Sequence, residues 1–304
     1  LPAGEADVAL VTNIAEDHLG EWGIQDLDML ADTKFIIRRA GKRLVLNADD
    51  ACSVARQELC TVPLTWFSLD AEQPLLVTHR RGGGHAAWLE DGALWWQDEA
   101  GARALLPVAE VPVTMDGAAR HNVANALAAV AVAFALGLPE AAILAGLRGF
   151  RSDAHDNPGR LNRFDIDGAT VLVDFAHNPH GLEALFEMAA AMPAKRRLVT
   201  IGHAGDRSDD AIRDVALSAW RSGVDRILIK EQEEHLRGRE PGEIPRIMHQ
   251  ALIEAGCPED RIGMTGSELE AAEQALDWAE PGDLLLILAL AQREEVLGML
   301  RGRS

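Results

Sequence analysis

Tyrosine is absent from the 304 residues, cysteine occurs three times, and no apolar run is long enough to span a bilayer. Cys52, Cys60 and Cys257 show no CxxC spacing, which excludes a disulfide framework or a cysteine-based zinc site and favours reduced thiols. The longest apolar stretches, 126–138 and 284–291, fall short of the roughly 20 residues that a membrane helix needs. Because a signal-peptide pattern is also missing, we expect a cytoplasmic protein.

Basic residues are scarce as well. The sequence has 29 lysines and arginines against 48 aspartates and glutamates, and its net charge is −19. A surface of this sign repels phosphate backbones and anionic lipids, so we expect neither nucleic acid nor membrane as a partner. Hydrophobic residues make up 48% of the chain, which is enough for buried cores, and the length predicts two domains of roughly 100–200 residues each.

Apolar runs alternate with helical patterns along the chain, an order typical of an α/β fold with mostly parallel sheets. A polar segment, 153–158, predicts a domain boundary that gives domains 1–157 and 158–304. In the first domain we expect strands at 7–13 and 43–47, helices at 27–40 and 122–138, and short antiparallel strands across 61–112. In the second we expect a hairpin joining 163–166 to 170–173, strands at 197–201, 226–230, 262–265 and 283–290, and helices at 181–192, 210–221, 243–255 and 269–279.

Polar clusters follow three of the predicted strands at the point where each strand ends. They are TNIAEDHLG at 12–20, DFAHNP at 174–179 and GHAGDR at 202–207. Open α/β sheets bind ligands beyond the carboxyl ends of their strands. The clusters therefore indicate a cleft between the two domains.

Each candidate residue also has a purely structural interpretation. A histidine after a strand is often a loop residue, an aspartate there is often a turn or cap, and an adjacent Asp-Arg pair is often a weak surface ion pair. These alternatives apply to His18, Asp174, Asp206 and Arg207. Asn122 and Asn125 can be plain capping and first-turn residues at the start of an alanine-rich helix.

The segments occur together and in one order, and that order resembles the successive motifs of the Mur ligase superfamily across essentially the whole chain. The segments that carry the resemblance are TNIAEDHLG (12–20), ADTKF (31–35), VLNADD (45–50), HNVANALAA (121–129), NPGRLN (157–162), DFAHNP (174–179) and GHAGDR (202–207). Three further segments, 82–91, 152–164 and 236–243, look more specifically like cyanophycin synthetases and related stand-alone ligases. The resemblance implies that residues 1–157 are the C-terminal portion of the central ATP-binding domain and residues 158–304 a Rossmann-like C-terminal domain.

Under this resemblance the cofactors are ATP and Mg²⁺, and His18 and Lys34 are the catalytic candidates. His18 would help to hold a Mg²⁺ ion, and Lys34 stands where several Mur ligases carry a carbamylated lysine that can bind a second Mg²⁺. An ordinary lysine on a helix surface is the alternative for Lys34. Residues that would bind the nucleotide are Asn122, Asn125, Arg160 and Asp174. Residues that would line the side where the incoming amine binds are His177, Asn178, Gly205, Asp206 and Arg207.

The sequence departs from the family's pattern in two places. Phe175 stands where the family usually has tyrosine, so a phenol there is dispensable under the resemblance. The Gly-rich phosphate loop, GxxxxGK[ST], does not occur in the sequence, and the acidic Mg²⁺ ligand that the family has between this loop and the TNI segment is missing too. By position both are expected upstream of Leu1, and residues 1–304 alone are expected to be inactive.

The resemblance implies an ADP-forming acid–amino-acid ligase, in which ATP phosphorylates a carboxylate and an amine then displaces phosphate to give an amide. The cyanophycin-like segments favour an aspartyl carboxylate joined to arginine or another amino acid, so a small-molecule or peptide substrate is the expected partner. Two alternatives stay open: a peptidoglycan or polyglutamate ligase of the same superfamily, and a non-catalytic nucleotide- or peptide-binding module. The sequence also leaves open whether the protein forms a homo-oligomer.

Overall fold

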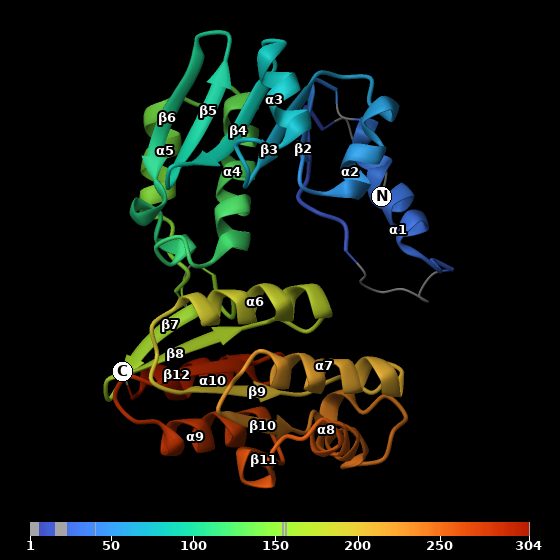
Figure 1. The fold of residues 1–304 in the computed structure, drawn as a ribbon, viewed down its shortest axis with the longest axis vertical. Coiled ribbons are helices and arrows are strands. Elements are labelled where there is room, and N and C mark those ends of the chain that lie inside the picture. Colours follow the sequence, from blue (N-terminus) through green and yellow to red (C-terminus); the bar gives the residue numbers. More distant parts are fainter. Residues whose placement is uncertain (1–5, 16–22, 40, 154, 156, 304) are drawn as a thin grey trace. The chain divides into compact units, whose positions relative to one another are not determined.

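The computed structural model describes residues 6–15, 23–39, 41–153, 155 and 157–303 (Figure 1). Its contacts divide the chain into two compact units, Leu1–Phe150 and Arg151–Ser304, which we call unit 1 and unit 2. Each unit has a six-stranded, mainly parallel sheet of its own with helices packed on it, and this confirms the predicted α/β fold. The domain boundary that the sequence places at 157/158 stays a prediction.

The sheet of unit 1 follows the order of the chain, β1-β2-β3-β4-β5-β6. Four parallel strands come first: β1 (Val8–Val11), β2 (Arg43–Asn47), β3 (Leu64–Ser68) and β4 (His85–Glu90). Two antiparallel strands complete it: β5 (Ala93–Asp98) and β6 (Gly101–Pro107). The helices are α1 (Leu27–Lys34), which continues as the 3-10 helix η1 (Phe35–Arg39), α2 (Ala51–Ala55), α3 (Pro74–Arg81), α4 (Arg120–Ala135) and α5 (Glu140–Gly149).

The sheet of unit 1 is covered on both faces, because successive residues of its strands point into different apolar clusters. On β2, Val45 belongs to the cluster that contains Leu127 of α4. Its neighbours Leu44 and Leu46 belong to the cluster that contains Leu30 of α1. A strand buried on both faces reads as a continuous apolar run, which is why the sequence predicts β2 with the bounds that the structure gives.

Two expectations for unit 1 are wrong in part. Antiparallel pairing across 61–112 holds for β4, β5 and β6, but β3 is parallel to both of its neighbours. Between β3 and β4, residues Pro74–Arg81 form the helix α3. Pro74 fits its first turn, and the Gln73 side chain accepts a hydrogen bond from the Leu76 amide at 2.9 Å. The helix expected at 27–40 is regular only as far as Lys34 and then tightens into η1.

The sheet of unit 2 has the order β11-β10-β9-β12-β8-β7, so the last strand of the chain lies between β8 and β9. All pairs are parallel except β7 with β8, the predicted hairpin. The strands are β7 (Asn162–Ile166), β8 (Ala169–Asp174), β9 (Arg197–Ile201), β10 (Arg226–Lys230), β11 (Ile262–Thr265) and β12 (Leu284–Leu288). The helices are α6 (Pro179–Ala191), α7 (Asp209–Arg221), α8 (Glu243–Glu254), α9 (Glu268–Trp278) and α10 (Arg293–Arg301).

Helices pack on unit 2 in two groups. α6 lies beside α7 and α7 beside α8 (Figure 1), whereas α9 packs against α10. The α9–α10 group covers an apolar cluster that includes Val171 of β8, Leu285 of β12 and Leu297 of α10. Among the described helices, none combines the length and apolar character that a membrane span requires. The three cysteines are free thiols, of which Cys257 is buried.

Candidate nucleotide and substrate site

In unit 1, the polar residues after β2 tie together the carboxyl ends of three strands. The Asn47 side-chain amide donates to the carbonyl oxygen of Thr12, just after β1, at 2.9 Å. The Asp49 carboxylate accepts from the Ser68 hydroxyl at the end of β3, at 2.6 Å. These residues of the VLNADD segment therefore set the shape of the sheet edge at which α/β folds bind ligands.

The two metal-side candidates of unit 1 are His18 and Lys34. His18 lies outside the described residues, so its predicted role as a Mg²⁺ ligand stays a prediction. Lys34 is the last residue of α1 and is exposed, a position that suits both the carbamylated lysine and the ordinary surface lysine. Within the described part of the chain, no group of three or more His, Cys, Asp or Glu side chains could hold a metal ion.

Asn122 and Asn125 lie on the same side of α4. The helix begins at Arg120 without a side-chain cap, so neither asparagine caps it, whereas Asn122 does lie in its first turn, as the structural interpretation expects. The Asn122 side-chain amide donates to the Val113 carbonyl at 2.8 Å, and the Asn125 amide donates to the Asn122 side-chain oxygen at 3.2 Å. Asn122 is thus held in place and Asn125 is exposed beside it, an arrangement that fits the predicted contact with a nucleotide.

In unit 2, Asp174 closes β8 and anchors the loop that precedes β7. One carboxylate oxygen accepts from the Ala176 amide at 2.8 Å and the other from the Leu161 amide at 3.0 Å. Burial raises the pKa of this carboxyl, against the opposing effect of these backbone donors. Leu161 has a φ of 52°, a left-handed conformation that is strained for leucine. Backbone strain of this kind persists only where surrounding contacts impose it, and here Asp174 supplies one of them.

The same loop presents Arg160 to solvent. Gly159 has a φ of 75°, and its amide donates to the Asn162 side chain at 2.6 Å. A Cβ at Gly159 would lie 2.4 Å from the Cδ atom of Arg293, so only glycine fits. The Arg160 guanidinium lies over the Phe175 ring at 5.0 Å, and the residue is exposed. An exposed planar cation at the carboxyl end of β8 suits the predicted phosphate contact.

The remaining residues of the DFAHNP segment organise the start of α6. His177 Nδ1 lies 2.9 Å from the Phe175 carbonyl oxygen, and the two rings meet edge to face with centroids 5.2 Å apart. Asn178 caps α6 by accepting a hydrogen bond from the Gly181 amide at 2.8 Å. Their predicted contact with the incoming amine stays a prediction.

The loop after β9 is built for close packing against the loop after β10. A Cβ at Gly205 would lie 1.9 Å from the Leu236 carbonyl oxygen, and the Gly205 amide donates to the His235 carbonyl at 2.8 Å. Asp206 forms an ion pair with Arg237. Gly205 and Asp206, predicted to line the substrate side, thus have structural partners of their own.

Arg239 is a structural residue that the sequence does not predict. Its guanidinium donates to the carbonyl oxygens of Gly205 at 3.0 Å and Arg207 at 2.7 Å, and it pairs with Asp209 and Glu243, each at 2.8 Å. Arg239 therefore holds the loop after β9 against the loop after β10. The only sequence signal is that Arg239 belongs to the 236–243 segment singled out by resemblance.

Replacing Gly205 by alanine should lower the free energy of unfolding by about 1–3 kcal/mol, because the new methyl group would overlap a backbone carbonyl that cannot rotate away. Chemical denaturation measures the change. Gly298→Ala is the matched control, since Gly298 is an exposed residue inside α10 with open space around it and should gain about 0.5–1 kcal/mol. Equal effects of the two substitutions would contradict the close approach at Gly205.

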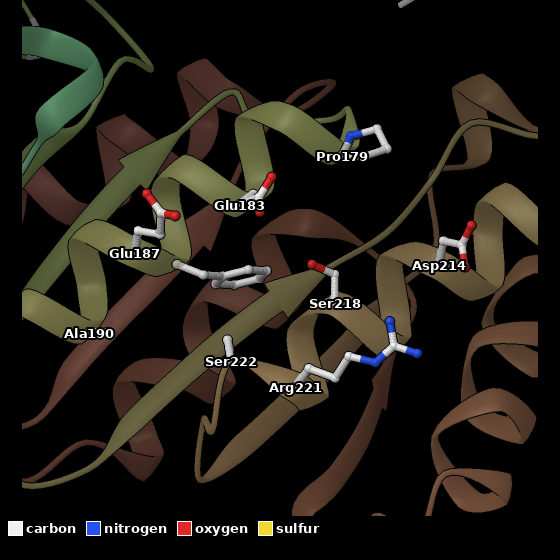
Figure 2. Close-up of a pocket in the computed structure, with 9 residues that line it drawn as sticks. Pro179, Glu183, Glu187, Ala190, Asp214, Ser218, Arg221 and Ser222 are labelled. Carbon is white, nitrogen blue, oxygen red and sulfur yellow. The ribbon is translucent and has the colours of Figure 1, made fainter. Parts of the chain in front are cut away.

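A groove of about 670 Å³ runs between α6 and α7. In Figure 2, Glu183 and Glu187 extend from α6, and Asp214 and Arg221 from α7. Its end at Pro179 adjoins Asn178, but the predicted site residues are not among those that line it. The lining residues are Pro179, Glu183, Phe186, Glu187, Ala190, Asp214, Ser218, Arg221 and Ser222.

Comparison with known proteins gives relatives of similar sequence. A cyanophycin synthetase of Crocosphaera subtropica is 34% identical over 284 residues, which is 92% of this chain and 32% of that protein. A UDP-N-acetylmuramyl-tripeptide synthetase of Deinococcus radiodurans is 28% identical over 92% of this chain and 53% of its own length. The chain therefore spans about a third to a half of the length of these curated relatives.

Solved structures share the fold. Escherichia coli FolC in complex with DHPP and ADP matches with a TM-score of 0.68 at 22% identity, over 98% of this chain and 61% of that one. A folylpolyglutamate synthase/dihydrofolate synthase of Yersinia pestis, complexed with AMPPNP and a Mn ion, matches with a TM-score of 0.67 at 22% identity, over 98% of this chain and 62% of that one.

Two family models match in succession. The Mur ligase middle domain covers residues 3–133, and the Mur ligase glutamate ligase domain covers residues 159–289. Between them they account for most of unit 1 and most of unit 2. The chain therefore belongs to the Mur ligase family and carries its middle and C-terminal domains.

Proposed function

We propose that the protein is an ATP-dependent, ADP-forming ligase that joins a carboxylate to an amine. The observation that carries the proposal is the exposed Arg160 guanidinium, held beside the carboxyl end of β8 by a strained loop that Asp174 anchors. A cation fixed at this edge of a parallel sheet suits a phosphate group. Membership of the Mur ligase family supports the same reaction class.

When bound, ATP supplies the phosphoryl group that turns the carboxylate into an acyl phosphate, from which the amine displaces phosphate. Arg160 would stabilise negative charge on the transferred phosphate. Asn122 and Asn125 would contact the base and ribose. Asp174 uses one lone pair of each oxygen on a backbone amide, and the remaining lone pairs can accept from ribose hydroxyls.

On the amine side, we propose that His177, Asn178 and the Gly205–Arg207 loop receive the incoming amino acid. His203, just before that loop, has its pKa lowered by burial, so its imidazole is neutral near pH 7 and does not repel a cationic substrate. Arg239 would keep the loop in shape through its contacts with the Gly205 and Arg207 carbonyls. Binding of Mg²⁺ by His18 and carbamylation of Lys34 belong to the proposal.

For the substrates, we propose an aspartyl side-chain carboxylate and arginine or another amino acid. The 34% identity to a cyanophycin synthetase supports this choice. A peptidoglycan ligase is the second candidate, because a muramyl-tripeptide synthetase is 28% identical over the same share of this chain.

The test measures ADP release by the protein in the form that its native cells produce. We expect ADP only when ATP, an aspartate-containing peptide and an amino acid are all present, with arginine and lysine compared side by side. Reactions that omit the peptide or the amino acid are the controls. ADP release with peptidoglycan precursors alone would replace the aspartyl assignment with the murein one. Absence of turnover with every acid–amine pair would contradict the ligase and leave a nucleotide- or peptide-binding module.

A further inference from the structure

A lysine without contact to solvent ends the strand β10. The side chain of Lys230 is 0% exposed, and its Nζ atom lies 2.5 Å from Oε1 of Glu268. The same ammonium group donates to the carbonyl oxygen of Leu288, the last residue of β12. One buried cation thus connects β10, the start of α9 and the end of β12.

Glu268 accepts hydrogen bonds from the loop that follows β12. Its carboxylate accepts from the backbone amides of Leu290 at 2.9 Å and Gln292 at 2.8 Å, and from the Gln232 side-chain amide at 3.1 Å. The Gln292 side chain in turn accepts from the Leu269 amide at 3.1 Å. Residues 289–292, which we call the β12 loop, are therefore fixed by one carboxylate.

The surroundings shift the pKa of both partners of the pair. Burial lowers the pKa of Lys230, and burial would raise that of Glu268, but the ammonium and the backbone N–H donors outweigh it and lower the Glu268 pKa. Apolar side chains of similar volume often stabilise a core as well as a buried ion pair does. The presence of an ion pair at this place is therefore better explained by the fixed geometry that it imposes on its neighbours than by a gain in stability.

The pair stands between the two halves of the candidate site in unit 2. On one side, a Cβ at Gly202 would lie 2.9 Å from both Cγ and the carbonyl oxygen of Lys230, so the chain leading to the Gly205–Arg207 loop rests on this lysine. On the other side, the β12 loop leads into Arg293, whose stem fills the space over Gly159. β12 lies between β8 and β9, where the strand order reverses.

We propose that Lys230 and Glu268 are positioning residues, whose ion pair fixes the β12 loop and thereby holds the phosphate-side loop around Arg160 in register with the amine-side loop around Gly205. The role in catalysis rests on the proposed ligase function. The coupling of the two loops is a property of unit 2 that is measurable without turnover.

The test uses Glu268→Gln, which keeps the size of the side chain but removes its charge and one acceptor. Asp283→Asn is the matched control. Asp283 is a buried carboxylate just before β12, at the end of that strand opposite to the β12 loop. Its side chain is 1% exposed and lies 2.5 Å from Arg196. Both substitutions break an ion pair with a buried carboxylate, and only Glu268 contacts the β12 loop.

In hydrogen exchange, Glu268→Gln should raise the exchange rates of the Leu290 and Gln292 amides, and also those of Gly159 and Leu161, by about tenfold or more. Asp283→Asn should leave these four amides close to the wild-type rates. In the ligase assay, Glu268→Gln should raise the KM for ATP and for the amine by about tenfold or more, and Asp283→Asn should raise neither. A Glu268→Gln protein that loses stability but keeps both KM values and the Gly159 and Leu161 exchange rates overturns the proposal.

If Glu268→Gln does not fold, Lys230→Met is the second variant, because it removes the ammonium group of the pair and keeps an apolar side chain of similar length. It should speed exchange at Leu290 and Gly159, and unchanged rates there overturn the proposal. Absence of turnover in the wild-type protein, in the form that its native cells produce, would refute the ligase function, whereas the exchange rates would still decide whether the pair couples the two loops.

Discussion

Residues 1–304 alone should release no ADP, whatever acid and amine are supplied. The sequence contains no GxxxxGK[ST] segment, so the backbone amides and lysine that cradle the triphosphate in P-loop proteins are missing from this chain. Each charge-assisted phosphate contact contributes about 1.5–3 kcal/mol, and each 1.4 kcal/mol is about tenfold in affinity. Loss of several contacts should therefore weaken ATP binding by orders of magnitude.

The measurement is ADP release with an aspartate-containing peptide and arginine, together with calorimetric titration of ATP. A chain extended upstream by a P-loop segment is the positive control and should turn over with the same substrates. If the 304 residues alone released ADP at a rate comparable with that control, the residues of the two units would suffice for binding and catalysis, and the need for a P-loop would be refuted.

In a chain extended upstream by a P-loop segment, replacing Arg160 by alanine should lower kcat/KM for ATP by about 10- to 150-fold, the loss expected when one charged contact of about 1.5–3 kcal/mol to a phosphate disappears. Because Arg160 is exposed and the ring contact that the described residues show for it is with Phe175, the free energy of unfolding should change by no more than about 0.5 kcal/mol. Steady-state kinetics and denaturation on the same preparation separate the two effects.

Arg163→Ala is the control for this substitution. Arg163 is three residues away, is also exposed and pairs with Asp165 on β7, outside the candidate site. Its loss should leave both kinetics and stability near wild type. Arg160→Lys should recover part of the activity, since a lysine restores the charge without the planar set of donors. Equal kinetic losses at Arg160 and Arg163 would show that general surface charge, and no specific phosphate contact, is responsible.

Most of the sheet architecture could be predicted from the sequence. β2, β9 and β10 have the predicted bounds, because strands covered on both faces are short apolar runs between polar residues. The edge strand β11 also has the predicted bounds. Weaker patterns were missed. α3 contains Val77 and Thr78, which favour strands, and its helical form depends on Gln73 and Pro74 at its start. α5 follows Gly137 and Pro139, which we interpreted only as the end of the preceding helix.

The sequence predicts which loops form the candidate site better than it predicts the contacts within those loops. The sequence placed Asp174 at the end of the strand that the structure shows as β8. The position of Arg160 beside it, over the Phe175 ring, was not predicted. The pair of Lys230 and Glu268 could not be predicted, since the two residues are far apart in sequence and neither spacing nor composition indicates that a lysine at a strand end is buried. Asp174 also accepts a hydrogen bond from the Ala176 backbone amide, a second role that its residue type alone does not reveal.

The strand order of unit 2 has a consequence for synthesis on the ribosome. In unit 1 each strand pairs with the one made just before it, so the sheet can grow as the chain emerges. In unit 2 the strand between β8 and β9 is Leu284–Leu288, which emerges after all the others. Until then β8 and β9 each have an unpaired edge, and exposed edges invite pairing with other chains. Newly made chains thus pass through a stage in which unit 1 can be folded while unit 2 depends on protection from aggregation.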